Sequence, residues 1–208
     1  MLQLTGAGLP GGFRLLKGWF DPEAQRALLD AVLSREAEAP FYRAEMPRTG
    51  QPMRVRNTNF GPLGWMSDRV GGYRYQARHP VTGRPWPDIP DMLLDLWARE
   101  SGWPQPPQAC LVNHYDATAK LSIHVDADED AAEAPVVSVS LGDQALFRIG
   151  GPERKGPTRS VWLSSGDVVI LGGAARRCFH GVDRIRYGSS RLVPFGGRIN
   201  LTLRRVTA

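Results

Sequence analysis

A chain of 208 residues, of which 42% are hydrophobic, is long enough for one domain with an extension or for one large β domain. The 17 Pro and 23 Gly residues argue against a helical bundle and favour an α+β fold that is mainly β. Two Cys residues, no apolar run long enough for a bilayer and no signal-peptide pattern at the N-terminus argue against secreted and membrane proteins, so we expect a cytoplasmic location.

The net charge of +5 is unevenly distributed along the chain. Residues 43–84 contain eight basic and two acidic residues. Residues 85–142 contain two basic and ten acidic residues, and residues 176–208 contain eight basic residues and one acidic residue. Basic segments on both sides of an acidic one suit a polyanion whose backbone lies outside an acidic pocket. Scattered solvated charges would give the same totals.

The first predicted helix begins after an arm. Residues 1–20 show no clear periodicity, and we expect them to be irregular. Asp21-Pro22-Glu23 predicts a helix start, with Asp21 as the N-cap and Pro22 in the first turn. An apolar stripe follows at helical spacing, formed by Ala24, Ala27, Leu28, Ala31 and Val32. We expect this helix to pack on a sheet.

The segment 41–86 combines arginines with aromatic residues and turns. Alternation around Arg54, Arg56 and Asn57 favours a hairpin, and Gly61-Pro62, Gly71-Gly72 and Gly83-Arg84-Pro85 predict turns. Its aromatic residues are Phe41, Tyr42, Phe60, Trp65, Tyr73, Tyr75 and Trp86. A second helix is predicted from Pro90 to about Glu100, with Met92, Leu93, Leu96 and Trp97 facing inward.

From Pro107 onward the pattern is that of β-strands. Val136–Leu141 alternates, Ser160–Leu163 and Val168–Leu171 are short apolar runs, and glycine-containing turns separate them. Short strands at regular spacing predict a sandwich or a jelly roll.

Three potential metal ligands stand in two segments. In a strand, His124 and Asp126 would share one face, and His180 follows in a later segment. Two imidazoles and one carboxylate suit a non-haem Fe(II) that keeps coordination positions open. A zinc site, a cupin-type binding site or ordinary structural histidines would also fit this pattern.

The C-terminal segment carries a second polar pattern. A strand would place Arg198, Asn200, Thr202 and Arg204 on one face and Ile199, Leu201 and Leu203 on the other. Two arginines on one face suit the two ends of a dicarboxylate, because guanidinium donors match carboxylate geometry. An exposed edge strand with a polar face is the alternative.

Together these motifs, His124-x-Asp126, His180 and Arg198-x-Asn200-x-Thr202-x-Arg204, resemble the AlkB family of Fe(II)/2-oxoglutarate-dependent dioxygenases, its bacterial members above all. The resemblance covers roughly residues 40–206. Like stretches include Asn113–Tyr115, Ala119–Ser122, Pro135–Leu141, Gly166–Val169, Asn57–Trp65 and Pro85–Pro87. It implies a double-stranded β-helix (jelly roll) core over residues 106–208. Residues 1–105 would form an extension with helices and a nucleotide-recognition lid at about 43–86, integrated with the core into one domain.

The resemblance also implies the roles of site residues. His124, Asp126 and His180 would be the catalytic iron ligands. The co-substrate 2-oxoglutarate would place one carboxylate on Arg204 near Asn200 and the other on Arg198, assisted by Asn113 and Tyr115. Dioxygen completes the requirements, with ascorbate as the reductant in vitro.

The implied reaction is oxidative demethylation of alkylated bases such as 1-methyladenine and 3-methylcytosine in single- or double-stranded DNA. This direct reversal of damage would release formaldehyde and succinate. Trp65 and Tyr73 would stack or pack at the flipped base, and Asp128 would face its positive charge, although core packing and an exposed loop acid are the plainer interpretations. The candidates for phosphate contact are Arg48, Arg54, Arg56, Arg69, Arg74 and Arg154.

Some positions depart from the family pattern, and other functions stay open. Leu171 and Cys178 stand where better-known bacterial members carry aromatics, and Asn57 stands at a lid position that is apolar in relatives. The rival functions are the same chemistry on RNA or tRNA, on a protein side chain or on a small molecule, a non-catalytic nucleic-acid-binding module, and a structural zinc protein. We expect a monomer with no obligate protein partner.

Overall fold

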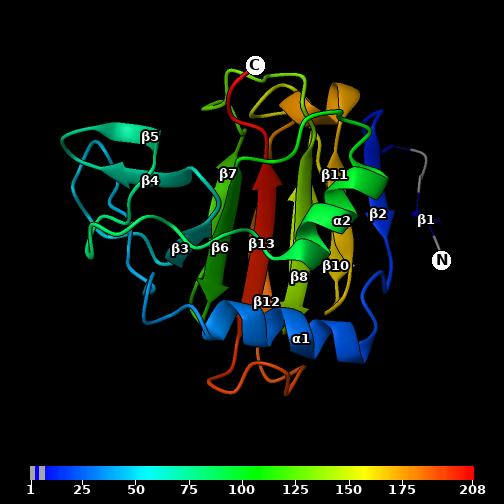
Figure 1. Cartoon of the computed structure of the whole chain (residues 1–208). Coiled ribbons are helices and arrows are strands. Elements are labelled where there is room, and N and C mark those ends of the chain that lie inside the picture. Colours follow the sequence, from blue (N-terminus) through cyan, green and yellow to red (C-terminus); the bar gives the residue numbers. More distant parts are fainter. Residues whose placement is uncertain (1–2, 5–7) are drawn as a thin grey trace.

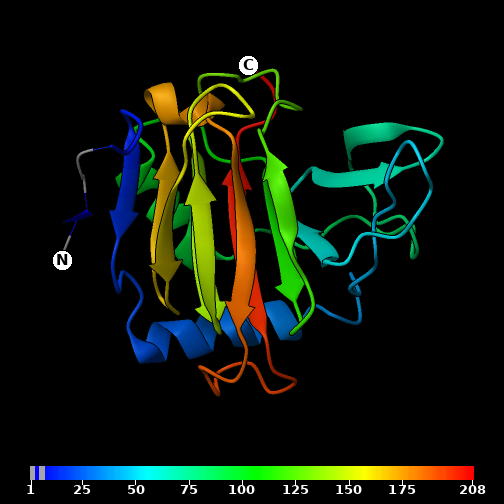
Figure 2. The same ribbon diagram turned by 180° about the vertical axis from the view of Figure 1, so that it is seen from behind.

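Two β-sheets face each other at the centre of the computed structural model, which describes residues 3–4 and 8–208 (Figures 1 and 2). The larger sheet runs in the order β1 (Gln3–Leu4), β2 (Phe13–Leu16), β11 (Val168–Leu171), β8 (Val136–Gly142), β13 (Arg198–Arg204), β6 (Ala109–Tyr115), β3 (Arg56–Phe60). The smaller sheet runs β10 (Arg159–Leu163), β9 (Gln144–Ile149), β12 (His180–Arg186), β7 (Leu121–His124). The predicted jelly roll is confirmed, and the three strands expected between residues 136 and 171 are present.

Apolar side chains fill the space between the two sheets. Phe147 and Val182 of the smaller sheet share this cluster with Val136, Val169 and Leu171 of the larger one. The period-2 alternation of the strands explains it, because every second side chain of β8 and β11 points to the same face.

Two helices cover the other face of the larger sheet (Figure 1). Helix α1 (Pro22–Leu33) begins as predicted, since the Asp21 carboxylate accepts the Ala24 N–H at 2.8 Å. Helix α2 (Asp91–Glu100) buries Leu93, Leu96 and Trp97. No helix in the described part of the chain combines the length and apolarity needed to cross a membrane.

The expectation of an irregular arm at residues 1–20 is wrong where the structure describes it. β2 pairs with β11 in the larger sheet, and β1 pairs with β2. Phe13 and Leu15 point between the sheets while Leu16 points to the helices, so both faces of this short strand are buried. Residues 1–2 and 5–7 lie outside the described residues.

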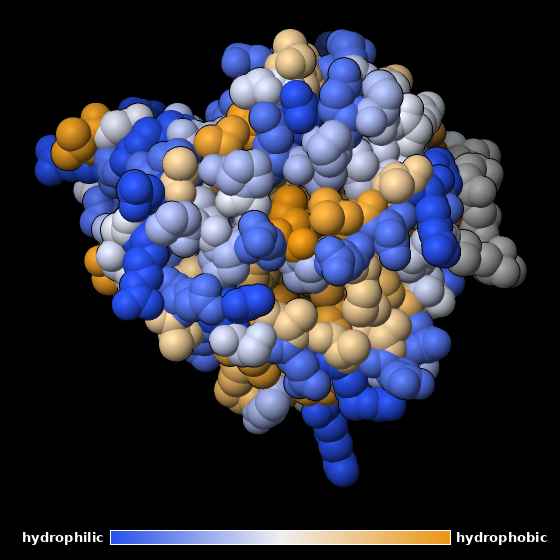
Figure 3. Space-filling view, viewed as in Figure 1, coloured by the Kyte–Doolittle hydropathy of each residue, from blue (hydrophilic) through white to orange (hydrophobic). Residues whose placement is uncertain are grey.

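The hairpin expected around Arg54–Asn57 is also misplaced. That stretch enters β3, which pairs with β6 at the edge of the larger sheet. The hairpin consists of β4 (Gly64–Asp68) and β5 (Gly72–Gln76), which pair only with each other among the described strands. It projects beside the sheets as a lobe with a mostly hydrophilic surface (Figures 1 and 3).

Candidate metal and anion site

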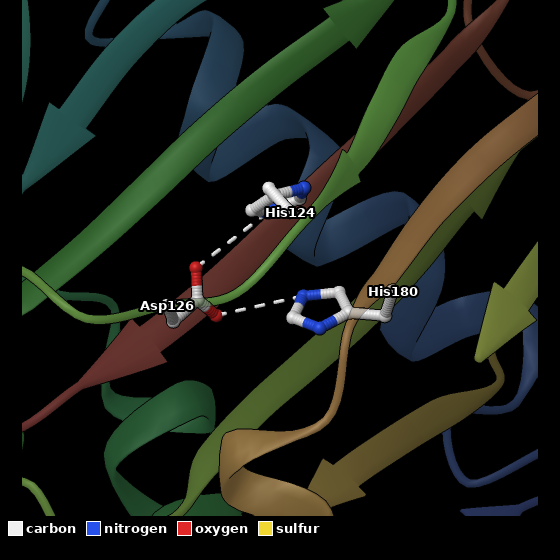
Figure 4. A group of neighbouring side chains, drawn as sticks. All are labelled: His124, Asp126 and His180. Atoms are coloured by element: carbon white, nitrogen blue, oxygen red, sulfur yellow. Dashed lines mark ion pairs between the residues drawn. The ribbon is translucent and has the colours of Figure 1, made fainter. Parts of the chain in front are cut away.

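Three side chains able to bind a metal converge at one end of the smaller sheet (Figure 4). His124 ends β7, Asp126 lies two residues beyond it and His180 begins β12. The Nε2 atoms of His124 and His180 lie 3.6 Å from Oδ1 and Oδ2 of Asp126, and the candidate ligand atoms of all three residues are within 4.8 Å of one another. This arrangement suits a single metal ion that all three side chains bind from the same side.

Strand pairing brings the two histidines together. His180 is directly opposite His124 in the ladder between β12 and β7. Gly181 permits this close approach, because a Cβ there would lie 2.7 Å from the Leu121 carbonyl oxygen. The expectation that His124 and Asp126 share a strand face is only partly met, since β7 ends at His124 and Asp126 belongs to the connection that follows.

Both imidazoles are oriented for metal binding. Nδ1 of His124 lies 3.0 Å from the Ser122 carbonyl and Nδ1 of His180 lies 3.0 Å from the Cys178 carbonyl. Each neutral ring can therefore donate from Nδ1 and keep the lone pair of Nε2 for an ion. Burial lowers the pKa of His180, which favours the neutral form. Burial also works to lower the pKa of His124, but the contact with Asp126 outweighs it and raises that pKa. A metal ion that binds His124 Nε2 would displace this proton.

The carboxylate of the group is held ionised. Asp126 is 7% exposed, and burial alone would raise its pKa. Arg204 and the two imidazoles outweigh that effect and hold the pKa well below its ordinary value. An ionised carboxylate with two neutral imidazoles is the donor set of a non-haem Fe(II), so the residues fit this ion.

Arg198 is a buried cation that an anionic ligand would stabilise. It is 2% exposed, Nε and Nη1 have no hydrogen-bond partner, and among the described residues no carboxylate forms an ion pair with it. Burial lowers its pKa to about 10. Its guanidinium lies 6.0 Å above the ring of Tyr115, its cross-strand neighbour in β6. A bound carboxylate would satisfy these free donors.

Arg204 is buried too, but it has acidic neighbours. Nη2 donates to Oδ1 of Asp126 at 2.8 Å, Nη1 donates to the Tyr75 hydroxyl at 3.3 Å, and Nε lies 3.4 Å from Oε1 of Glu129 without forming a hydrogen bond. Burial lowers the pKa of Arg204, but Asp126, Tyr75 and Glu129 outweigh it and raise the pKa above its ordinary value. Arg204 thus links the metal group to the arginine-bearing face of β13.

The remaining predicted 2-oxoglutarate residues lie on the same pair of strands. Asn113 is the cross-strand neighbour of Asn200, and its Oδ1 accepts from Asn57 Nδ2 at 2.5 Å, which points the Asn113 NH₂ group elsewhere. The Asn200 amide donates to Ser138 Oγ and the Val139 carbonyl. The Asn113 NH₂ group therefore remains free to donate to a ligand. The Asn200 NH₂ group is already used, and its contacts fix this side chain on the polar face of β13. Both assignments stay predictions.

The central position of β13 removes the edge-strand alternative. It lies between β8 and β6, and the apolar row of Ile199, Leu201 and Leu203 packs in the core beneath the helices. The polar row faces the smaller sheet, where Arg204 meets Asp126. Gly197, with φ +85°, permits the approach that places Arg198 beside Tyr115, because a Cβ there would overlap the Tyr115 carbonyl oxygen.

Three of the predicted substrate residues lie together. The rings of Trp65 and Tyr73 are stacked with centroids 5.8 Å apart, and Trp65 Nε1 donates to Oδ2 of Asp128 at 2.9 Å. Asp128 is exposed two residues after Asp126, so this group lies next to the metal group. Arg154 lies apart, in the connection between β9 and β10, with its guanidinium 5.9 Å from the ring of Phe179, which precedes His180.

Sequence reasoning missed four residues that shape the site. Asn57 is buried in β3 and orients Asn113. Tyr75, Glu129 and Arg176 form contacts around Arg204 and Asp126. The roles of these residues become visible only when distant segments pair. The acidic run after Asp126 was the one sequence feature that pointed to Glu129. Leu171 and Cys178 are buried between the sheets, and Cys178 Sγ donates to the Ala174 carbonyl.

Comparison with known proteins agrees with this site. Residues 12–204 match the 2OG-Fe(II) oxygenase superfamily. The alpha-ketoglutarate-dependent dioxygenase AlkB homolog of Caulobacter vibrioides is 57% identical over 196 residues, which are 93% of this chain and 87% of that protein. Escherichia coli AlkB is 41% identical over 186 residues, covering 88% and 85% of the two chains. The solved structure of OsALKBH1 superposes with a TM-score of 0.79 at 27% identity, covering 98% of this chain and 100% of that one.

Shorter stretches match proteins whose names state a substrate. These are a DNA N(6)-methyladenine demethylase of Arabidopsis thaliana, ALKBH1A, which is 37% identical over 140 residues, and a tRNA demethylase of Schizosaccharomyces pombe, abh1, which is 37% identical over 78 residues. They cover 64% and 38% of this chain, and 39% and 26% of the respective relatives.

The fold and the site define a 2-oxoglutarate-dependent dioxygenase that uses Fe(II) and dioxygen. The chain belongs to the 2OG-Fe(II) oxygenase superfamily and, within it, to the AlkB family. The resemblance inferred from the motifs is therefore confirmed.

Proposed function

We propose that this enzyme removes methyl groups from alkylated bases of DNA, with 1-methyladenine and 3-methylcytosine as the class of substrate. The observation that carries the proposal is the placement of an aromatic pair and an exposed acid, Trp65, Tyr73 and Asp128, beside the His124, Asp126 and His180 group. A demethylase of bases needs this juxtaposition, because the base must be held where its methyl group meets the metal.

His124, Asp126 and His180 would hold the iron from one side, and the opposite positions stay open for co-substrates. Arg198 and Arg204 would hold the two carboxylates of 2-oxoglutarate, with Tyr115 and Asn113 beside them. When bound, iron and 2-oxoglutarate would supply the oxidising chemistry. The overall reaction would convert the methylated base, 2-oxoglutarate and O₂ into free base, formaldehyde, succinate and CO₂.

The hairpin side of the site would receive the base. The stacked rings of Trp65 and Tyr73 offer an aromatic face, and Tyr73 is 50% exposed and accessible to a ligand. Asp128 would place a negative charge near a base that methylation makes cationic. Its bond to Trp65 Nε1 fixes the carboxylate relative to the ring.

The arginines that remain free suit a phosphate backbone. Arg74 is paired with Asp68, and Arg56 is engaged with His114 and the ring of Phe41. Arg48, Arg54, Arg69 and Arg154 are exposed, and we infer that phosphate contacts come from these four. We also propose that the chain acts as a monomer in the cytoplasm without an obligate protein partner, and that the extension 1–105 and core 106–208 work as one unit.

The names of relatives favour nucleic acid as the substrate and include both DNA and tRNA demethylases. The same chemistry on RNA is therefore the second candidate. Parallel assays on DNA and RNA oligonucleotides of one sequence, each with one 1-methyladenine, decide between them by formaldehyde and succinate release. We expect equal amounts of both products and a faster reaction on DNA. A faster reaction on RNA favours the second candidate, and succinate without formaldehyde from either refutes base demethylation.

A further inference from the structure

A polar chain of contacts connects the hairpin to the metal group. The hydroxyl of Tyr75, on β5, donates to Oε1 of Glu129 at 2.5 Å and accepts from Arg204 Nη1 at 3.3 Å. Arg204 in turn donates to Oδ1 of Asp126 at 2.8 Å. Tyr75 is thus two hydrogen bonds away from a proposed iron ligand, although it belongs to the element proposed to receive the base.

Arg176 fixes the middle of this chain. It lies in the 3₁₀ helix Gly173–Arg177, is 3% exposed, and its Nη2 donates to Oε2 of Glu129 at 2.9 Å. The other nitrogens donate to the carbonyls of Asp126 at 2.6 Å and Ala134 at 2.8 Å. One Glu129 oxygen is therefore held by Arg176, and the other is left for Tyr75 and Arg204.

Among the described residues, the hairpin has one other side-chain hydrogen bond to the segment after β7, and its acceptor is exposed, not buried. Trp65 bonds to Asp128, which is exposed and would face the base. Glu129 is 6% exposed and faces Arg204, which would face 2-oxoglutarate. A hairpin that moves relative to the sheets must break or remake the Tyr75 contact. Glu129 Oε1 would then lose its hydrogen bond and keep only the Arg204 guanidinium nearby, which is costly for a buried charged acceptor.

We propose that Tyr75 and Glu129 are positioning residues that couple the two ligand sites, so that nucleic acid on the hairpin and 2-oxoglutarate on Arg204 strengthen each other's binding. This inference rests on the proposed function, since it takes the hairpin as the nucleic-acid site. Binding of the oligonucleotide fixes the hairpin and with it the Tyr75 hydroxyl, which orients Glu129 and Arg204 for the carboxylate. Thermodynamic linkage makes the effect reciprocal.

The coupling is measured as a ratio of affinities. The dissociation constant of 2-oxoglutarate is determined by calorimetry for the Fe(II) protein under argon, without and with a saturating DNA oligonucleotide that carries one 1-methyladenine. We expect the oligonucleotide to tighten 2-oxoglutarate binding by about tenfold in the wild type, within the usual range of such couplings. In Tyr75→Phe, which keeps the ring and removes only the hydroxyl, the ratio falls to one.

Three further variants make the test more specific. Glu129→Gln removes the charge and should also abolish the ratio, and the double variant should show no additional loss if both residues act in one chain. Tyr187→Phe removes a hydroxyl from a 57% exposed tyrosine elsewhere and keeps the wild-type ratio. Tyr75→Phe decides the matter alone if Glu129→Gln does not fold. A general loss of stability leaves a ratio of affinities unchanged, so a merely structural role would not reproduce the result.

A failure of the coupling and a failure of the proposed function give different results. A wild type that demethylates the oligonucleotide but shows a ratio of one, or a Tyr75→Phe variant that retains the wild-type ratio, overturns the coupling and leaves the proposed function intact. A wild type that neither binds nor demethylates the oligonucleotide overturns both.

Discussion

Replacing Arg198 with Met should change the stability and the ligand affinity of the protein in opposite directions. Arg198 is 2% exposed, and two of its nitrogens lack a hydrogen-bond partner. Met fills a similar volume along the stem without a charge. The variant therefore removes a buried cation that has no ion-pair partner among the described residues and, with it, the donors proposed for a carboxylate.

The variant gains stability because it no longer pays the desolvation cost of the buried guanidinium. Replacing a buried ion pair with apolar side chains of similar volume is often neutral or stabilises proteins by about 1–4 kcal/mol, and a single buried cation carries the same kind of desolvation cost. We expect the lower end, about 1 kcal/mol, because the Tyr115 ring 6.0 Å from the guanidinium already compensates part of the cost. The ligand-free variant should thus unfold at higher urea concentration than the wild type.

The loss of affinity is larger. Nε and Nη1 can each donate one charge-assisted hydrogen bond to a carboxylate, and each such bond contributes about 1.5–3 kcal/mol. Together they amount to about 3–6 kcal/mol, which corresponds to a loss of about 10²–10⁴-fold in 2-oxoglutarate affinity.

Urea denaturation of the ligand-free protein and calorimetry with 2-oxoglutarate under argon measure the two effects. Arg26→Met, on the exposed face of α1, is the matched control for the change in charge and should alter neither value. An Arg198→Met variant that is destabilised without ligand would contradict the desolvation cost assigned to Arg198, and one that binds 2-oxoglutarate like the wild type would contradict its role in carboxylate binding.

Three further predictions concern the metal, the base and pH. His180→Ala should abolish formaldehyde release while fluorescence anisotropy shows unchanged oligonucleotide binding; loss of both would contradict separate metal and backbone contacts. Asp128→Asn can keep the bond from Trp65 Nε1 but removes the charge, so kcat/KM should fall about tenfold more on cationic 1-methyladenine than on neutral 1-methylguanine, and an equal loss would count against an electrostatic role. Burial lowers the pKa of His79 below 6.5, and its Nδ1 accepts the amide hydrogens of Val81 and Thr82. Since the unfolded chain gains this proton first, the free energy of unfolding should fall as pH drops below about 6.5, and His79→Gln should show a shallower slope in urea denaturation; an identical slope would assign the pH dependence to other groups.

The site was predictable where local chemistry determines it. His124, Asp126 and His180 carry the ligand atoms themselves, and the alternation of Arg198–Arg204 defines a two-faced strand that the structure places in the middle of a sheet. Both helices were predictable for the same reason, because caps and apolar stripes are local signals.

Contacts between distant segments were not predictable in this way. β2 pairs with β11, about 150 residues away, and its few apolar residues among glycines gave no periodic signal. Asn57 reads as a polar residue of a hairpin until β3 is seen beside β6, where its amide meets Asn113. Glu129 likewise reads as one acid in an exposed run, whereas Arg176 of the 3₁₀ helix buries it.

Base demethylation is tested by the mass of a single-stranded DNA oligonucleotide that carries one 1-methyladenine. The mass is measured after incubation with the protein, Fe(II), ascorbate, 2-oxoglutarate and air. We expect the loss of one methylene unit in the complete mixture and no loss when 2-oxoglutarate is omitted. An unchanged mass, obtained with folded and iron-loaded protein that still binds the oligonucleotide, would contradict base demethylation and favour a non-catalytic binding module.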